Sequence, residues 1–371
     1  AAFMAGMVGR LTGRPGACLT TLGPGAANMV IGVGEAYLGY QPMVAMSGQL
    51  SRACQRKPRK QYLDLMSLFR PITKGVISPA SANEVAGSAR RAFGLAAQER
   101  PGPVYLELPE DVMKERLEGE MRLAPWEESC GPSSPDLDAI KDLLLGAERP
   151  VVLAGAGVVR GHASAELVRF AERWGVPVAM TWLGAGSVPF DHPLSLGTVG
   201  LRRADLMRSA FEAADLVLLV GFDLVEFEPQ YWNFGTAKKV AYIGAAPCDT
   251  VPGFAPDLQI VSDVRLTLGS LGDHGSSKQV WTSELKAKLT ATLADVPDGQ
   301  KGVKPQAIVR AIRNALGRED IAVSDVGAHL IWMAQRYPVD RENTLLMSNG
   351  LIPMGVGVPW AIAAKLVHPD Q

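Results

Sequence analysis

The sequence contains little cysteine. Its four cysteines, Cys18, Cys54, Cys130 and Cys248, lie far apart in a chain of 371 residues, so the spacings of zinc sites and CxxC motifs are absent. So few thiols do not form the disulfide framework of a small secreted domain. The N-terminal segment lacks the pattern of a secretory signal. We therefore expect a protein of a reducing compartment, the cytoplasm.

An excess of charge of one sign and long apolar runs are also missing. The 37 Lys and Arg against 38 Asp and Glu give a net charge of −1, which excludes the basic footprint of a nucleic-acid-binding protein or a polybasic membrane anchor. No apolar run reaches the roughly 18 residues that span a bilayer. Because 47% of the residues are hydrophobic, a disordered chain is excluded too. We expect a globular protein whose partner is a small molecule.

Common catalytic motifs are absent as well. The sequence has no G-x-S-x-G, P-loop or H-E-x-x-H pattern, and its five histidines limit the candidates for a general base. Residues 155–161 form a glycine-containing turn after a strand-like run. They do not fit G-x-G-x-x-G, and no ribose-binding acid follows in register. We interpret them as a tight turn rather than a dinucleotide site.

What is present is a repeated alternation of strand-like and helix-like segments. Buried β-rich runs at 17–22, 43–48 and 103–109 are separated by segments with helical spacing, and the same rhythm returns after residue 135 and again after residue 304. Strands that alternate with helices indicate parallel sheets covered by helices. The predicted fold class is α/β, with three doubly wound parallel-sheet units.

The linkers divide the chain into domains. The polar, proline-containing segment 117–135 separates a first domain, residues 1–116, from a central domain, residues 136–271. A second polar connection, residues 272–303, precedes the start of a third domain, residues 304–371. This last domain is too short to close a sheet, and the chain begins within a helix-like segment. We therefore expect a fragment that is cut at both ends.

One turn carries a specific indication of a ligand. Gly23, Pro24 and Gly25 follow a predicted strand, at the edge where open α/β sheets bind ligands. Glycine allows close approach of the backbone, and proline stiffens the loop. Asn28 then offers a donor and an acceptor to a flat heterocycle. An ordinary turn with Asn28 near the helix cap explains the segment equally well.

Other candidates are weaker when taken alone. The turn at 325–329 follows a strand and suits a phosphate group, although a capped helix with a polar His329 is commoner. Met354 reads as core packing, and Gln61 with Asp64 as a solvated helix face. The two glutamates in VEFEPQYWN (225–233) read as part of a surface loop.

Several long segments, in order along the chain, resemble the thiamine-diphosphate-dependent enzymes of the acetolactate synthase type. They are AAFMAGMVGRLTGRPG, GPGAANMVIGVGEAYL, PMVAMSGQL, FRPITK, RPGPVYLELPEDV, SDVGAHLIWMAQRY and SNGLIPMGVGVPWAIAA. The resemblance implies a pyrimidine-binding domain, a central Rossmann-like domain and a partial diphosphate-binding domain. It also implies the condensation of two pyruvates to 2-acetolactate and CO₂, in a homodimer or homotetramer whose active sites lie between subunits.

The resemblance assigns the cofactor site residue by residue. Cofactor-binding positions implied by it are Pro24, Gly25, Asn28, Gln61, Val326, Gly327, His329 and Met354. Gln61 corresponds to the family's active-site glutamine and is the one catalytic candidate in the chain, although Lys60 precedes it where an aromatic residue or His is usual. Ala328 replaces a polar residue of the diphosphate turn, and Ile352 replaces Gly or Gln near the acceptor substrate.

Two expected features fall outside the chain. The resemblance places the activating Glu just upstream of Ala1 and the Mg²⁺ ligands just beyond Gln371. Since Mg²⁺ anchors the diphosphate through oxygen ligands, we expect these 371 residues alone to bind the cofactor poorly and to leave pyruvate unconverted.

The subtype and some alternatives stay open at this point. The segments GTVGLRRAD and GFDLVEFEPQYWN look more like the catabolic, FAD-independent synthases than the FAD-containing biosynthetic ones. Sulfoacetaldehyde acetyltransferase, glyoxylate carboligase and oxalyl-CoA decarboxylase are near alternatives. A non-catalytic nucleotide-binding paralogue is a more distant one, and the turn at 155–161 speaks against it.

Overall fold

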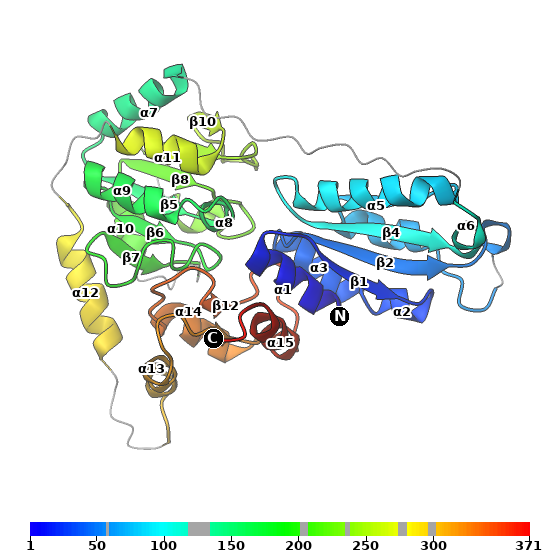
Figure 1. Cartoon of the computed structure of the whole chain (residues 1–371). Helices are drawn as coiled ribbons and strands as arrows, with labels where there is room; N and C mark the ends of the chain where they lie inside the picture. Colours follow the sequence, from blue (N-terminus) through cyan, green and yellow to red (C-terminus); the bar gives the residue numbers. More distant parts are fainter. Residues whose placement is uncertain (57–58, 118–133, 201–206, 234–237, 274–279, 296–301) are drawn as a thin grey trace. The chain divides into compact units, whose positions relative to one another are not determined.

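The computed structural model divides the chain into two compact units (Figure 1). Unit 1 comprises Ala1–Glu128 and Gly350–Gln371, and unit 2 comprises Ser129–Asn349. The structure describes residues 1–56, 59–117, 134–200, 207–233, 238–273, 280–295 and 302–371. The predicted linker 117–135 and the connection 272–303 lie largely or partly outside these ranges. The three-domain division of the sequence stays a prediction.

Unit 1 contains a parallel sheet of four strands in the order β1-β2-β4-β3. The strands are β1 (Gly16–Thr20), β2 (Met43–Gln49), β3 (Gly75–Ile77) and β4 (Pro103–Pro109). In the register of β2 and β4, Ser47 is paired with Glu107. Because all four strands run in one direction, the loops that follow them meet at one edge of the sheet.

Helices cover both faces of this sheet. They are α1 (Ala2–Thr12), α2 (Pro24–Ala27), α3 (Val30–Leu38), α4 (Leu65–Phe69), α5 (Ala82–Ala97), α6 (Glu110–Lys114) and α15 (Gly357–Val367), with short 3₁₀ turns η1 (Arg52–Cys54) and η2 (Arg70–Ile72). Helix α1 lies beside α15, as Figure 1 shows in blue and dark red. It also contacts the sheet closely, because a Cβ on Gly9 would lie 1.9 Å from the carbonyl oxygen of Pro42.

Unit 2 is built on a six-stranded parallel sheet in the order β10-β9-β8-β5-β6-β7. The strands are β5 (Pro150–Ala154), β6 (Val178–Met180), β7 (Ser195–Thr198), β8 (Leu216–Val220), β9 (Lys239–Gly244) and β10 (Leu258–Val261). The chain winds outward from β5 in one direction and then from β8 in the other. The point where the order reverses, between β5 and β8, is where doubly wound sheets form a crevice.

The remaining elements of unit 2 surround the sheet and form a smaller subcore. They are α7 (Ser134–Gly146), α8 (Ala156–Arg160), α9 (Ser164–Trp174), α10 (Arg208–Ala213), η4 (Pro229–Tyr231), α11 (Val264–Gly272), α12 (Ser283–Ala294), α13 (Pro305–Ala315), β11 (Ala322–Val323), α14 (Ala328–Arg336) and β12 (Leu345–Leu346). Strands β11 and β12 pair in parallel. Val309, Leu330 and Met333 pack with Trp182 in one hydrophobic cluster.

The α/β class and the parallel sheets are confirmed. The predicted runs at 17–22, 43–48 and 103–109 correspond to β1, β2 and β4, with small differences at the ends of β1 and β2. Strand β3 escaped prediction because it has only three residues and lies at the edge of its sheet. Residues 155–161, interpreted as a tight turn, contain the short helix α8, and Gly155 alone connects it to β5.

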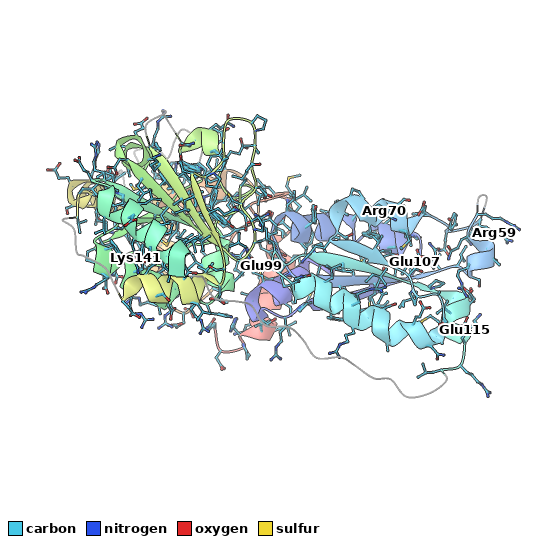
Figure 2. All side chains as sticks on the ribbon, turned by 90° about the horizontal axis from the view of Figure 1, so that it is seen from above. Arg59, Arg70, Glu99, Glu107, Glu115 and Lys141 are labelled. Carbon is cyan, nitrogen blue, oxygen red and sulfur yellow. The ribbon has the colours of Figure 1, made fainter. Side chains whose placement is uncertain are left out.

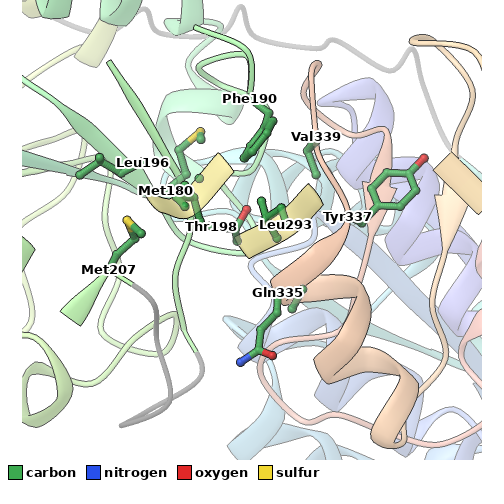
Figure 3. A pocket seen from close by; sticks show the side chains of 12 residues that line it. Met180, Phe190, Leu196, Thr198, Met207, Leu293, Gln335, Tyr337 and Val339 are labelled. Carbon is green, nitrogen blue, oxygen red and sulfur yellow. The ribbon is translucent and has the colours of Figure 1, made fainter. Parts of the chain in front are cut away.

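A small cavity in unit 2 lies beside strands β6 and β7 of the six-stranded sheet (Figure 3). It is lined by Met180, Thr198, Phe190 and Leu293 among others, with Tyr337 at one side. Its volume of about 20 Å³ suits at most a single water molecule. We interpret it as a packing defect and not as a substrate pocket.

None of the helices in the described ranges combines the length and the apolar character that crossing a membrane requires.

Candidate functional site

The glycine turn and the Gln61 loop contact each other at the carboxyl edge of the unit 1 sheet. Gly23 has φ 59°, a backbone conformation that favours glycine. A Cβ at this position would lie 2.5 Å from the backbone oxygen of Gln61 and 3.1 Å from its Cβ. The fold therefore brings together two segments that are 38 positions apart, and both were candidates from the sequence.

The polar and stiff residues of the glycine turn face solvent. Pro24 is the first residue of α2, and Asn28 is its C-terminal cap. Both side chains are exposed, whereas Ala26 between them is buried in the core. Gly25 is tightly placed, since a Cβ there would lie 2.7 Å from Cγ2 of Thr21. The turn thus offers an exposed amide beside a rigid backbone.

Gln61 does not lie on a helix face, and this alternative interpretation was wrong. Its backbone is left-handed, with φ 63°, and helix α4 begins only at Leu65. Asp64 is the N-cap: its carboxylate accepts hydrogen bonds from the backbone N–H of Ser67 at 3.0 Å and from its hydroxyl at 2.7 Å. The bond from that backbone N–H is the main cause that lowers the pKa of Asp64.

A buried polar ladder lies beneath this loop, on β2 and β4. The hydroxyls of Ser47 and Tyr105 are 2.6 Å apart, and Gln49 donates to Glu107 at 3.2 Å. Glu107 is 4% exposed, and burial is the largest cause that raises its pKa. Figure 2 labels Glu107 among the side chains of unit 1. The sequence reasoning missed these residues, although two polar side chains in alternate positions of an otherwise apolar strand run were a usable signal.

An exposed arginine fastens the neighbouring loops of the same edge. Arg52 Nε contacts the Asp111 carboxylate at 2.7 Å, and an Nη donates to the carbonyl of Ala80 at 2.7 Å. These bonds join the loops that follow β2, β4 and β3. These segments therefore hold one another in a defined conformation, at the same edge of the sheet as the glycine turn.

The expected diphosphate turn lies in unit 2, directly after β11. The N–H of Val326 donates to the Asp325 carboxylate at 2.7 Å. Gly327 is the N-cap of the nine-residue helix α14, and its φ of 156° suits glycine. A Cβ on Gly327 would lie 2.8 Å from the ring of His329. Both Gly327 and His329 are exposed.

Among the described residues of unit 1, Met354 is the most exposed large hydrophobic residue. Its side chain is 84% exposed, so the interpretation as core packing was wrong. The segment before it is held in place, because a Cβ on Gly350 would lie 2.4 Å from the Cβ of Leu38. Ile352 has a left-handed backbone with φ 56°. An exposed thioether on a bent, fixed segment is available to an apolar ligand surface.

The crevice of the unit 2 sheet contains a buried carboxylate. Glu226 is 4% exposed, so the surface-loop interpretation was wrong for this residue, although Glu228 is exposed as expected. The carboxylate oxygens of Glu226 accept hydrogen bonds from the N–H of Ala156 at 3.0 and 3.1 Å, from the N–H of Asp223 at 3.1 Å, and from the Thr181 hydroxyl. Burial, followed by the charge of Asp223, raises the pKa of Glu226 to about 7.

An ion pair lies beside this carboxylate. An Nη of Arg160 is 3.2 Å from the carboxylate of Asp223. The carboxyl ends of β5 and β8 are therefore joined by the protein's own polar groups. Among the residues that the structure describes, no cluster of three or more His, Cys, Asp and Glu side chains could hold a metal ion.

Three domain families match the chain. "Thiamine pyrophosphate enzyme, N-terminal TPP binding domain" matches residues 1–68, "central domain" of the same enzymes matches 137–271, and "C-terminal TPP binding domain" matches 325–371. Thiamine pyrophosphate is another name for thiamine diphosphate. The matched ranges include every residue implied as cofactor-binding.

Curated relatives match the chain from end to end. It is 32% identical to "Acetolactate synthase" of Bacillus subtilis and 31% identical to "Acetolactate synthase, catabolic" of Raoultella terrigena, in each case over 100% of this chain and 67% and 68% of the relative. It is 30% identical to the chloroplastic acetolactate synthase of Arabidopsis thaliana, over 99% of this chain and 57% of that protein. The chain spans about two thirds of the first two relatives. It belongs to the acetolactate synthase family of thiamine pyrophosphate enzymes.

Proposed function

We propose that the protein is an acetolactate synthase, which condenses two pyruvates to 2-acetolactate with release of CO₂. The observation that carries this proposal is the contact between Gly23 and Gln61 in a chain similar throughout to such enzymes. It gives the glycine turn and the candidate catalytic glutamine one common location. The substrate class is a small 2-oxo acid.

The described residues fit thiamine diphosphate in chemical type. We assign its ring end to the turn of Pro24, Gly25 and Asn28 with Gln61, because Gly23 of this turn contacts Gln61 and both amide side chains are exposed. Met354 would supply an exposed apolar surface to the cofactor. When bound, thiamine diphosphate supplies a nucleophilic carbon and an electron sink for decarboxylation.

The diphosphate end is assigned to the turn of Val326, Gly327 and His329. Apart from the Val326 N–H, which donates to Asp325, backbone N–H groups at the start of the nine-residue helix α14 favour an anion. Gly327 allows the backbone to take a conformation that other residues resist. A Mg²⁺ ion would neutralise the diphosphate through oxygen ligands.

The residues of the chain itself bind and orient the reactants. Asn28 offers both a donor and an acceptor to a heterocycle. Gln61 has a left-handed backbone and an exposed amide, which can hydrogen-bond a carboxylate or carbonyl of the substrate. Such fixed polar groups lower the barrier by orientation.

We propose that the protein lacks FAD, because Glu226 lies in the crevice where doubly wound sheets bind dinucleotides. A dinucleotide places its pyrophosphate against the N–H groups of the first turn. Here the N–H of Ala156 already donates to Glu226. The Glu226 side chain fills this position whether or not it is ionised, and an ionised carboxylate also repels phosphate.

Exposed apolar residues support the proposal of a homodimer or homotetramer. Val358, Ile362 and Leu366 recur at every fourth position of α15 and are 69%, 48% and 69% exposed. Residues with this spacing share one face of a helix. An exposed apolar face of this kind is typical of an interface.

Product analysis tests the proposed function. The protein expressed from its complete reading frame, with thiamine diphosphate and Mg²⁺, should release CO₂ from pyruvate and form acetolactate, detected as acetoin after acid treatment. Glyoxylate, sulfoacetaldehyde and oxalyl-CoA are supplied in parallel. Turnover of one of these in place of pyruvate would assign the protein to a related carboligase or decarboxylase.

A further inference from the structure

The side-chain amide of Gln49 is fully used in holding its surroundings. Gln49 ends β2 and is 2% exposed. Its Nε2 donates to the carbonyl oxygen of Leu63 at 3.0 Å and to Oε2 of Glu107 at 3.2 Å, and its Oε1 accepts from the N–H of Leu50 at 3.0 Å. With both N–H groups and the oxygen engaged, the amide has one orientation.

The partner on β4 makes this orientation rigid. Glu107 is buried on β4, the strand next to β2, and in the β2–β4 register it is paired with Ser47. One step earlier on the same strands, Ser47 and Tyr105 are hydrogen-bonded at 2.6 Å, and Phe69 stacks on Tyr105 with ring centroids 4.2 Å apart. The Ser47–Tyr105 hydrogen bond and the stacking of Phe69 from α4 therefore hold the polar ladder in place.

The Leu63 carbonyl connects this ladder to the candidate site. Leu63 is two residues after Gln61, whose backbone packs on Gly23. The loop is thus held at two points, by a close contact at Gly23 and by the hydrogen bond from Gln49.

Apolar packing of residues 61–63 is limited to Tyr62, which is half-buried. The Gln61 side chain is exposed and Leu63 is 43% exposed, whereas the buried anchors Leu65 and Phe69 come later, within α4. The bond from Gln49 is a hydrogen bond that joins this part of the loop to β2.

We propose that Gln49 is a positioning residue, which together with Glu107 sets the place of the Gln61 loop relative to the glycine turn at Gly23. The proposal rests on the proposed function only in so far as Gln61 contacts the cofactor or substrate. Gln49 itself is buried and acts through Leu63.

Hydrogen exchange of the backbone amides in residues 59–64 tests the anchor directly. Gln49→Ala should speed this exchange roughly tenfold, about the effect of one lost hydrogen bond. The matched control is Gln55→Ala, which removes a glutamine bond to the Leu50 carbonyl at 2.8 Å and should leave residues 59–64 unchanged. Equal exchange in wild type and Gln49→Ala would overturn the anchor.

A charge exchange separates the anchor from general stability. Gln49→Glu removes the donor to Leu63 and places two carboxyl groups together, so the melting temperature should fall and the loop should open. The double variant Q49E/E107Q removes the repulsion and should recover part of the melting temperature. It should not recover slow exchange at 59–64, because the Leu63 carbonyl still lacks its donor. Recovery of both together would indicate a merely structural role.

Cofactor binding and kinetics test the positioning role in the protein from the complete reading frame. Gln49→Ala should weaken thiamine diphosphate binding or lower kcat by roughly tenfold, and Gln55→Ala should change neither. Faster exchange with unaltered binding, kcat and KM would overturn the positioning role. If the wild type bound no thiamine diphosphate, the proposed function would fail and the link to the cofactor with it, while exchange would still decide the anchor.

Discussion

Glu226 and Glu228 lie two residues apart and have opposite environments. Glu226 is buried and accepts hydrogen bonds from Ala156 and Thr181, whereas Glu228 is exposed. Local sequence cannot separate the two, because the partners of Glu226 lie 70 and 45 positions away along the chain. Such burial of a carboxyl group depends on the tertiary fold alone.

The raised pKa of Glu226 predicts a specific pH dependence of stability. Its pKa rises from an ordinary 4.5 to about 7 in the folded protein, so between these values the folded state binds more protons than the unfolded state. The free energy of unfolding therefore falls as pH rises through this window, by on the order of 3 kcal/mol for this group. Urea titrations from pH 4.5 to 8 should show this decline in the wild type and a shallower one in Glu226→Gln.

Glu228→Gln is the matched control for this experiment. The substitution is the same, but Glu228 is exposed, so the pH dependence should equal that of the wild type. A decline of equal slope in the wild type and in Glu226→Gln would contradict the assignment of the window to Glu226.

Gly23 and Gly13 allow backbone strain to be separated from close contact. Gly13→Ala places a Cβ at φ 66° with no atom within 4 Å, so it should lower the free energy of unfolding by about 1 kcal/mol. Gly23→Ala adds a Cβ 2.5 Å from the Gln61 oxygen and should cost on the order of 3 kcal/mol. Urea unfolding measures both, and only Gly23→Ala should weaken thiamine diphosphate binding. Equal losses would show that the Gln61 loop moves aside freely.

At the scale of elements, the sequence predicted those strands that are long and buried along most of their length. Strands β2 and β4 have seven residues each with nearly continuous burial, and apolar runs of this length indicate strands. The short edge strand β3 depends on pairing with β4, which no local pattern shows. Gln61 and Asp64 were interpreted as a solvated helix face, but Asp64 is the N-cap of α4 and the helix begins after both residues.

The cap at Asp64 gives a prediction for the helix and the loop together. Asp64→Ala removes two hydrogen bonds to Ser67 and should lower the free energy of unfolding by about 1 kcal/mol. The cap of α11 provides the control, since Asp263 accepts from the N–H of Leu266 at 2.8 Å and Asp263→Ala should cost a similar amount. Calorimetric titration should show weaker thiamine diphosphate binding in Asp64→Ala only. Equal effects of Asp64→Ala and Asp263→Ala on thiamine diphosphate binding would show that the α4 cap has no specific influence on the site.

The lowered pKa of Asp64 predicts how the stability contributed by this cap depends on pH. Its carboxylate is favoured in the folded state, so the cap stabilises above the ordinary pKa of an aspartate and is lost as pH falls through the folded value. Because the side chain is exposed, solvent screening keeps the effect small. The difference between wild type and Asp64→Ala should therefore shrink in acid.

At the scale of the whole molecule, the fold class followed from patterns, but the site did not. Residue-level reasoning left the turn of Pro24 and Asn28 undecided between a ligand loop and an ordinary turn. The resemblance singled out Gln61, and the structure added that Gly23 contacts it. Gln49 and Glu107 were missed because their role arises from strand pairing and from a loop 14 residues beyond Gln49.

Ligand-linked stability tests the cofactor assignment for the molecule as a whole. A ligand that binds only the folded state raises the free energy of unfolding, by about 2.7 kcal/mol at a hundredfold excess over its Kd. Thiamine diphosphate with Mg²⁺ should therefore raise the melting temperature of the protein from the complete reading frame. FAD should leave it unchanged, because Glu226 already accepts from the Ala156 N–H that a pyrophosphate requires. A shift with FAD that persists in Glu226→Gln would show that flavin binds elsewhere, and no shift with thiamine diphosphate would contradict the proposed function.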